Sequence, residues 1–241
     1  MSGKLLVVGD SFADRYYETR RELKYEPINL YWFEKLREEL NLELINLSKC
    51  GSGNKQIFDK AFDRINNEKN ISLVVIVWSE FGRVDLETKD NDYIEYNPEW
   101  CRFRGYSKMK DKFFLMWEKA HEYYELDNQR RGVDNFLRYT ISLTLLAKEK
   151  GIKIIQFFGC TPTYSFSTIN YLLSCDLLHK LDEKDYIGYP FLKDLGGFSM
   201  QEKFKEPYHV VSLKDKHPNQ KGNDLILKFI MEKYEKIINS R

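Results

Sequence analysis

A serine stands directly behind the first apolar run of the chain, in the stretch KLLVVGDSF. The aliphatic residues 5–8 end on the tripeptide Gly9-Asp10-Ser11. A serine hydroxyl at the mouth of a sheet can attack an ester once a neighbouring base removes its proton. The same tripeptide also suits an ordinary strand-to-helix turn, because aspartate and serine are preferred helix caps. Taken alone, the tripeptide favours the turn.

The elements that must position Ser11 alternate between short apolar runs and helical patterns. Strands are predicted at 4–8, 42–47, 72–78, 152–159 and 209–213, and helices at 27–40, 54–68, 133–151 and about 220–239. Pro27 suits the first position of its helix. This alternation predicts an α/β fold with a mainly parallel, five-stranded sheet. Because ligands bind beyond the carboxyl ends of the strands in such sheets, Ser11 is expected where chemistry takes place.

Composition narrows the class of protein. The 241 residues include 38 basic and 37 acidic side chains, for a formal charge of +1. That balance predicts neither a nucleic-acid partner nor a polybasic membrane anchor. The four cysteines are too far apart for a zinc or redox motif, so no metal is expected. With no signal-peptide pattern and no apolar run near ~20 residues, we expect a cytoplasmic protein, and a virion protein would look the same.

Two segments, about 85–130 and 160–207, read as insertions in a single domain, 1–241. The first is rich in aromatic residues, which include Trp100, Phe103, Tyr106, Trp117, Tyr123 and Tyr124. They either pack the insertion onto the sheet or line a cleft for sugar or acyl groups. The second contains a D-x-x-H spacing at Asp176 and His179, inside a helical pattern that favours a surface or packing role. A solvated turn is predicted at 127–132. His121 and His209 are expected to be structural.

Three further segments follow the serine block in a fixed order: NLSKCGSGN (46–54), WSEFGRVD (78–85) and LKDKHPNQKGN (213–223). Together the four blocks resemble the SGNH/GDSL hydrolase family. The resemblance implies a flavodoxin-like, three-layer α/β/α sandwich. It also implies that Ser11 is the nucleophile, that His217 is its base, and that Asp215 orients the imidazole.

The resemblance further implies an oxyanion hole. The backbone N–H groups of Ser11 and Gly51 would be two donors, and Asn54 or Ser79 would add a side-chain donor. Asn54 suits a helix cap equally well. Ser79 can equally be a polar residue that ends the preceding strand without a role in catalysis.

This chain departs from the family pattern in two places. The acid stands two residues before His217, whereas the common form has it three before, where this chain has Lys214. A carboxylate at Asp215 can still reach the ring. The usual asparagine of the third block is also missing, and the pattern W-S-x-x-x-R-x-D looks like a variant form found in phage-encoded members. Arg83 and Asp85 are interpreted as a local ion pair.

The sequence therefore predicts a serine esterase that cleaves a small ester, such as an O-acetyl group on a carbohydrate, without metal or organic cofactor. Its partner would be a small molecule or glycan, and the oligomeric state is open. The alternative is a catalytically weak or inactive SGNH module with a binding or structural role, for example in a viral particle. A third hypothesis is a flavodoxin-like nucleotide binder that uses the Gly51 loop.

Overall fold

The fold is built on four parallel strands that run in the order β2-β1-β3-β6. The computed structural model describes residues 3–15, 28–87, 93–96, 119 and 128–239. The strands are β1 (Lys4–Gly9), β2 (Glu43–Asn46), β3 (Ile71–Trp78) and β6 (Lys153–Phe158). A separate antiparallel pair consists of β4 (Val84–Glu87) and β5 (Tyr93–Tyr96).

The helices are α2 (Trp32–Glu39), α3 (Asn54–Asn67), α6 (Asn128–Glu149), α7 (Phe166–Ser174), α8 (Met200–Lys203) and α9 (Gln220–Asn239). Short 3₁₀ turns lie at Leu178–Lys180 (η1), Glu183–Asp185 (η2) and Lys193–Leu195 (η3). Within the described ranges, no helix is long and apolar enough to cross a membrane.

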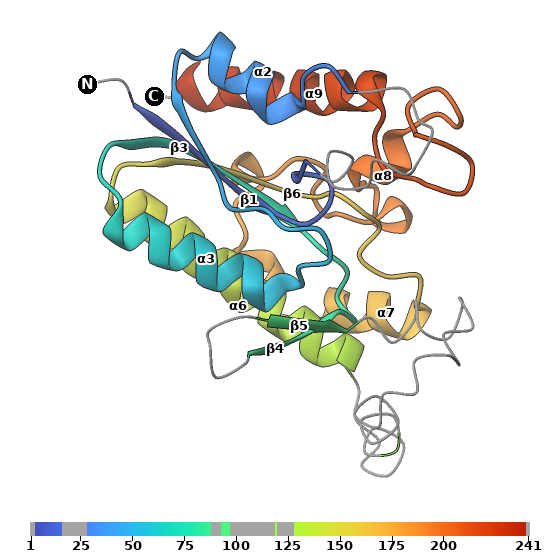
Figure 1. Ribbon diagram of the computed structural model, residues 1–241. Helices are drawn as coiled ribbons and strands as arrows, with labels where there is room; N and C mark the ends of the chain where they lie inside the picture. Colours follow the sequence, from blue (N-terminus) through green and yellow to red (C-terminus); the bar gives the residue numbers. More distant parts are fainter. Residues whose placement is uncertain (1–2, 16–27, 88–92, 97–118, 120–127, 240–241) are drawn as a thin grey trace.

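Helices cover both faces of the sheet, with α2 and α9 on one side and α3 and α6 on the other (Figure 1). The strands divide their side chains between these layers, because successive residues of a strand point to opposite faces. Leu5 and Val7 of β1 pack into the core under α2 and α9, while Leu6 and Val8 pack into the core under α3 and α6. The arrangement is the predicted three-layer α/β/α sandwich.

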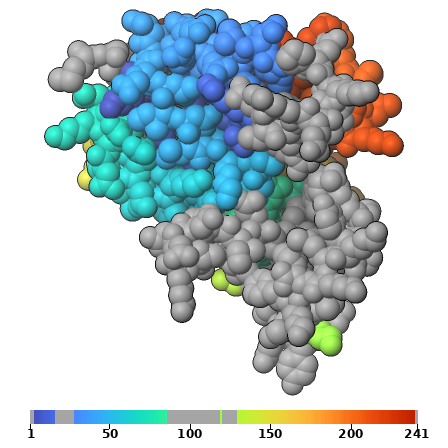
Figure 2. All heavy atoms as spheres, viewed as in Figure 1, coloured from blue at the N-terminus to red at the C-terminus, as the bar shows by residue number. Residues whose placement is uncertain are grey.

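Helices α2 and α9 lie next to each other. In the space-filling view the blue surface of the N-terminal part lies beside orange-to-red atoms of the C-terminal part (Figure 2). The backbone N–H of Trp32 donates to Asn223 Oδ1 at 3.1 Å, and Lys35 pairs with Asp224 at 2.6 Å. Residues near both ends of the sequence are therefore fixed to one another.

The fifth strand predicted at 209–213 is not present. Val210 forms only an isolated antiparallel bridge with Pro218, and the Val211 N–H donates to the carbonyl of His217 at 3.0 Å. The apolar residues that suggested a strand instead fold this segment back on itself as a loop. In the described residues, the sheet therefore has four strands, not five.

The helix predicted at 27–40 begins later, at Trp32. The N–H groups of Asn29 and Leu30 donate to the side chain of Gln220 at 3.0 and 3.3 Å, so these residues are held outside the helix. Pro27, predicted as the first helical residue, lies outside the described residues.

Both insertions contain more regular structure than the sequence indicated. Helix α6 starts at Asn128, so most of the turn predicted at 127–132 is helical. The second insertion contributes α7, α8 and the three 3₁₀ turns. The aromatic residues of the first insertion, from Trp100 to Tyr124, lie outside the described residues, as does His121.

A polar network lies inside the core between β6, α6 and η2. Gln156 Oε1 accepts hydrogen bonds from Trp78 Nε1 at 3.1 Å and from Thr140 Oγ1 at 2.7 Å. Its Nε2 donates to Thr144 Oγ1 at 2.8 Å and to the Tyr186 hydroxyl at 3.3 Å. Since buried polar groups are costly unless paired, this network fixes how α6 and the segment around Tyr186 sit against β6.

Replacing Gln156 by leucine should lower the free energy of unfolding by about 2–3 kcal/mol, because the Trp78 and threonine donors lose their partner in the core. Urea unfolding measures the change. Ser142→Ala on an exposed position of α6 is the matched control and should stay near the wild-type value. A Gln156→Leu protein as stable as the wild type would contradict this account of the network.

Candidate active site

Ser11, His217 and Asp215 form one hydrogen-bonded row. His217 Nε2 lies 2.7 Å from Ser11 Oγ, and His217 Nδ1 lies 2.6 Å from Asp215 Oδ1. All three residues are partly exposed. A serine next to a histidine whose other ring nitrogen faces a carboxylate has the geometry that nucleophilic hydrolysis requires.

The loop 209–218 explains how an acid only two residues before the histidine can serve it. The Asp215 N–H donates to Ser212 Oγ at 3.0 Å, and the Ser212 N–H donates to the Asp215 carbonyl at 3.1 Å. This turn directs the carboxylate of Asp215 back along the chain, where it also accepts the His217 N–H at 3.2 Å. On the other side, the ring of Phe12 packs on the imidazole with centroids 5.6 Å apart.

Ser11 itself sits on a turn built by Asp10. Asp10 Oδ1 accepts the N–H of Phe12 at 3.0 Å, and its carbonyl accepts the N–H of Ala13 at 3.0 Å. Residues 10–14 form turns and bends, not the first turn of a helix. Gly9 is required because a Cβ there would lie 2.6 Å from Val77 Cβ on the neighbouring strand.

The second block forms a loop beside this turn. The Lys49 N–H donates to the Gly9 carbonyl at 3.0 Å, and the Cys50 N–H donates to Asp14 Oδ2 at 2.8 Å. Gly51 has a φ of +93°, a conformation that favours glycine. The Gly51 loop, residues 47–53, is therefore docked against the Ser11 turn.

Asn54 and Ser79 are joined to one another. Asn54 Oδ1 accepts the Ser79 N–H at 2.8 Å, and Asn54 Nδ2 donates to the Ser79 carbonyl at 3.1 Å. Asn54 is the first residue of α3, and the N-cap position is held by Gly53. Ser79 is fully buried at the end of β3.

Arg83 and Asp85, interpreted above as a local ion pair, both bind backbone groups of a neighbouring segment. Asp85 accepts the N–H groups of Gly53 at 2.8 Å and Gln56 at 2.9 Å, and so satisfies donors at the start of α3. Arg83 Nη1 donates to the carbonyl of Ser52 at 3.1 Å. The R-x-D spacing indicates that both side chains can contact the same loop, because residues two positions apart in an extended segment point to the same side.

Two buried ionisable groups, Asp10 and Cys160, lie next to the Ser11 turn. Burial raises the pKa of the Asp10 carboxyl, and the nearby Arg83 guanidinium opposes that rise. Cys160 Sγ lies 3.8 Å from Asp10 Oδ2. Burial, together with the Asp10 carboxylate, raises the pKa of the Cys160 thiol well above its ordinary value.

Two other histidines of the described residues, His179 and His209, are not part of this row. His179 is exposed in η1, and Asp176 is exposed just before it. His209 Nδ1 accepts the backbone N–H of Lys205 at 2.9 Å, which is a structural role. Across the described ranges, no three His, Cys, Asp or Glu side chains are grouped so that they could hold a metal ion.

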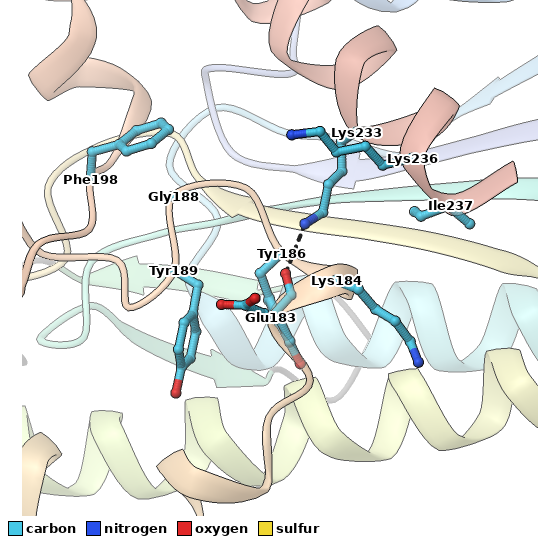
Figure 3. A pocket seen from close by; sticks show the side chains of 9 residues that line it. All are labelled: Glu183, Lys184, Tyr186, Gly188, Tyr189, Phe198, Lys233, Lys236 and Ile237. Atoms are coloured by element: carbon cyan, nitrogen blue, oxygen red, sulfur yellow. Dashed lines mark hydrogen bonds between the residues drawn. The ribbon is translucent and has the colours of Figure 1, made fainter. Parts of the chain in front are cut away.

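A cavity of about 430 Å³ lies elsewhere, beside the C-terminal half of α9 (Figure 3). It is lined by Glu183, Lys184, Tyr186, Gly188, Tyr189, Phe198, Lys233, Lys236 and Ile237. Lys233 Nζ donates to the carbonyl of Glu183 at 2.8 Å across one side of it. None of these residues belongs to the four sequence blocks that carry the predicted chemistry.

Comparison with known proteins identifies the fold. No protein-family model and no curated protein sequence matches the chain. Among solved structures, the chain is similar to TesA, with 15% identity, a TM-score of 0.51, and coverage of 95% of this chain and 97% of TesA. It is also similar to the psychrotrophic esterase EstA from Pseudoalteromonas sp., with 12% identity, a TM-score of 0.52, and coverage of 99% and 100%.

The chain has the SGNH hydrolase fold. The resemblance that the four sequence blocks carry is thus confirmed at the level of the fold. Within the SGNH fold, the first block lies at the carboxyl end of β1, and the second and third blocks follow β2 and β3 at the same edge of the parallel sheet.

Cys160 should resist alkylation in the native protein, because its thiol is buried and its pKa is raised. Iodoacetamide at about pH 8 should label the partly exposed Cys50 much sooner, which peptide mass mapping after timed labelling would measure. In urea the two cysteines should react at comparable rates. Rapid labelling of Cys160 in the folded protein would contradict its buried place beside Asp10.

Proposed function

We propose that the chain is a serine ester hydrolase. The observation that carries the proposal is the row of Ser11, His217 and Asp215, with contacts of 2.7 and 2.6 Å. Ser11 Oγ attacks the ester carbonyl carbon while His217 Nε2 takes the hydroxyl proton, and Asp215 stabilises the imidazolium. The tetrahedral intermediate collapses, the alcohol leaves with that proton, and water then hydrolyses the acyl-enzyme by the same steps.

The oxyanion would be held by the N–H groups of Ser11 and Gly51 and by Asn54. An amide nitrogen carries two N–H donors, and Asn54 Nδ2 gives one of them to the Ser79 carbonyl. Its second N–H is the donor that replaces the missing asparagine of the third block. Ser79 has no exposed surface, whereas 6% of Asn54 is exposed, which favours Asn54 over Ser79 in this role.

The proposed substrate is a small ester, such as an O-acetyl group on a carbohydrate. This choice rests on the resemblance to the SGNH hydrolases and on the esterase EstA, whose structure carries monoethylphosphonate as inhibitor. The missing third-block asparagine favours a second candidate, an inactive module of the same fold that only binds its ligand.

Ser11→Ala should abolish hydrolysis of p-nitrophenyl acetate, with a loss of at least about 10³-fold in kcat, because no other group replaces the nucleophile. The assay compares the two proteins at equal concentration, with the exposed Ser142→Ala as the matched serine control. Equal rates in wild type and Ser11→Ala would exclude Ser11 as the nucleophile.

An ethyl fluorophosphonate separates the enzyme from the inactive module without a choice of substrate. It should add covalently to the peptide that contains Ser11 in the wild type, because a base-activated serine attacks phosphorus as it attacks a carbonyl. Mass spectrometry reads the adduct. A wild type that neither hydrolyses the ester nor takes up the phosphonate would support the inactive module.

Asp215→Asn should lower kcat by about 10³–10⁴-fold while KM changes little, because the ring of His217 then loses the carboxylate that sets its tautomer and stabilises its charge. Steady-state kinetics with the same ester measure both constants. Lys214→Ala is the control, since Lys214 is exposed one residue away at the position where the family has its acid. Near-normal activity in Asp215→Asn would remove Asp215 from the mechanism.

A further inference from the structure

Arg83 contacts both of the loops that the proposed reaction requires. Its Nη1 atom donates to the Ser52 carbonyl at 3.1 Å and lies 3.9 Å from Asp10 Oδ2. Its Nη2 atom lies 3.8 Å from Glu80 Oε2. Only 11% of the side chain is exposed, so these contacts form in a largely dry environment. The guanidinium therefore bridges the Ser11 turn and the Gly51 loop.

On the side of the nucleophile, Arg83 balances a buried charge. The Asp10 carboxylate contacts the Phe12 N–H, the Cys160 thiol and Arg83. The thiol is a neutral group, since its pKa is raised far above its ordinary range. Among the described residues, Arg83 is the cation with the larger effect on Asp10, and His217 acts on it in the same direction more weakly. A buried carboxylate that loses its cation is strongly destabilised, and here that carboxylate holds the turn that carries Ser11.

On the side of the oxyanion donors, Arg83 fixes a peptide group of the Gly51 loop. The Ser52 N–H donates to the Lys49 carbonyl at 3.1 Å, and the Ser52 carbonyl accepts from Arg83. The next N–H, that of Gly53, donates to Asp85 Oδ1 at 2.8 Å. Arg83 and Asp85 thus hold the carbonyl and the N–H of one peptide bond, two residues from the N–H that Gly51 would direct at the substrate.

We propose that Arg83 is a positioning residue that couples the Ser11 turn to the Gly51 loop. This inference rests on the proposed function. It adds that Arg83 holds the nucleophile and the oxyanion donors at a fixed position relative to each other. A guanidinium suits the task because its rigid, planar donors can point at two acceptors at once, whereas a lysine ammonium is a flexible point charge. The third block of this chain, which lacks the donor asparagine, thereby orients the donors of the second block.

The kinetic test compares Arg83→Met, Arg83→Lys and the wild type on p-nitrophenyl acetate. Arg83→Met should lower kcat by about 100-fold with KM within about 3-fold of the wild type, because a small misplacement of reacting groups slows the chemical step. Arg83→Lys keeps the positive charge but loses the planar pair of guanidinium donors, so its kcat should lie between those of Arg83→Met and the wild type. A raised KM with unchanged kcat would overturn the proposal, since it would make Arg83 a group that binds substrate.

The control for loss of an arginine is Arg64→Met on α3, which breaks an ion pair with Glu68 at 2.9 Å away from the site. It should keep the wild-type kcat. If Arg83→Met does not unfold cooperatively, Arg83→Lys carries the comparison, and a kcat equal to the wild type in that variant would overturn the proposal.

A second measurement does not depend on activity. Amide hydrogen exchange, followed by mass spectrometry, should become faster in the peptides that cover residues 10–14 and 49–54 in Arg83→Met, and should not change there in Arg64→Met. Unchanged exchange in both segments would overturn the coupling, whether or not the chain is an esterase. If the wild type shows no Ser11-dependent hydrolysis, the proposed function fails, and the exchange data still decide whether Arg83 joins the two loops.

Discussion

The structure of the site depends on one buried carboxylate, that of Asp10. Its Oδ1 atom accepts the N–H of Phe12 and closes the turn on which Ser11 stands. Its Oδ2 atom faces Arg83 and Cys160 from within the protein. A carboxylate in this position is costly unless it is paired. Asp10 therefore needs partners inside the protein next to Ser11, and the Phe12 N–H and Arg83 supply them.

The close approach of strands sets a second constraint at the same point. Gly9 leaves no room for a side chain against Val77, so β1 and β3 meet tightly just where the turn begins. All strands of the sheet are parallel, and their carboxyl ends share one edge. For that reason Ser11, the Gly51 loop and Ser79, which are far apart in the sequence, come together at one edge of the sheet.

The sequence predicted those parts of the fold that follow from local patterns. The runs 4–8 and 72–78 are continuous aliphatic stretches, and both became buried parallel strands. The run at 209–213 has a similar composition, yet its neighbours Pro218 and Asp215 turn it into the loop that carries His217. Composition alone cannot separate these outcomes, because a short apolar segment fits a strand or a packed loop equally well.

At the site, sequence reasoning named the row of Ser11, Asp215 and His217 by resemblance, and the distances among them are those that the predicted chemistry needs. It missed the partners of Arg83 and Asp85. A sequence shows that two opposite charges are near each other along the chain, and the simplest interpretation pairs them. In the structure, Arg83 donates to the Ser52 carbonyl and Asp85 accepts the Gly53 N–H, so both bind the backbone of the Gly51 loop. These contacts depend on how β4 lies against α3.

The separation of Ser11 and His217 by 206 positions along the chain has a consequence for biosynthesis. The loop that carries His217 is held at the start of α9, and α9 is fixed to α2 through Trp32 and Asn223. During synthesis on the ribosome, Ser11 is therefore made long before its hydrogen-bond partner His217. Contacts of this sequence distance form late in folding, so the hydrogen bond between Ser11 and His217 should form only after α9 has been synthesised and has docked against α2.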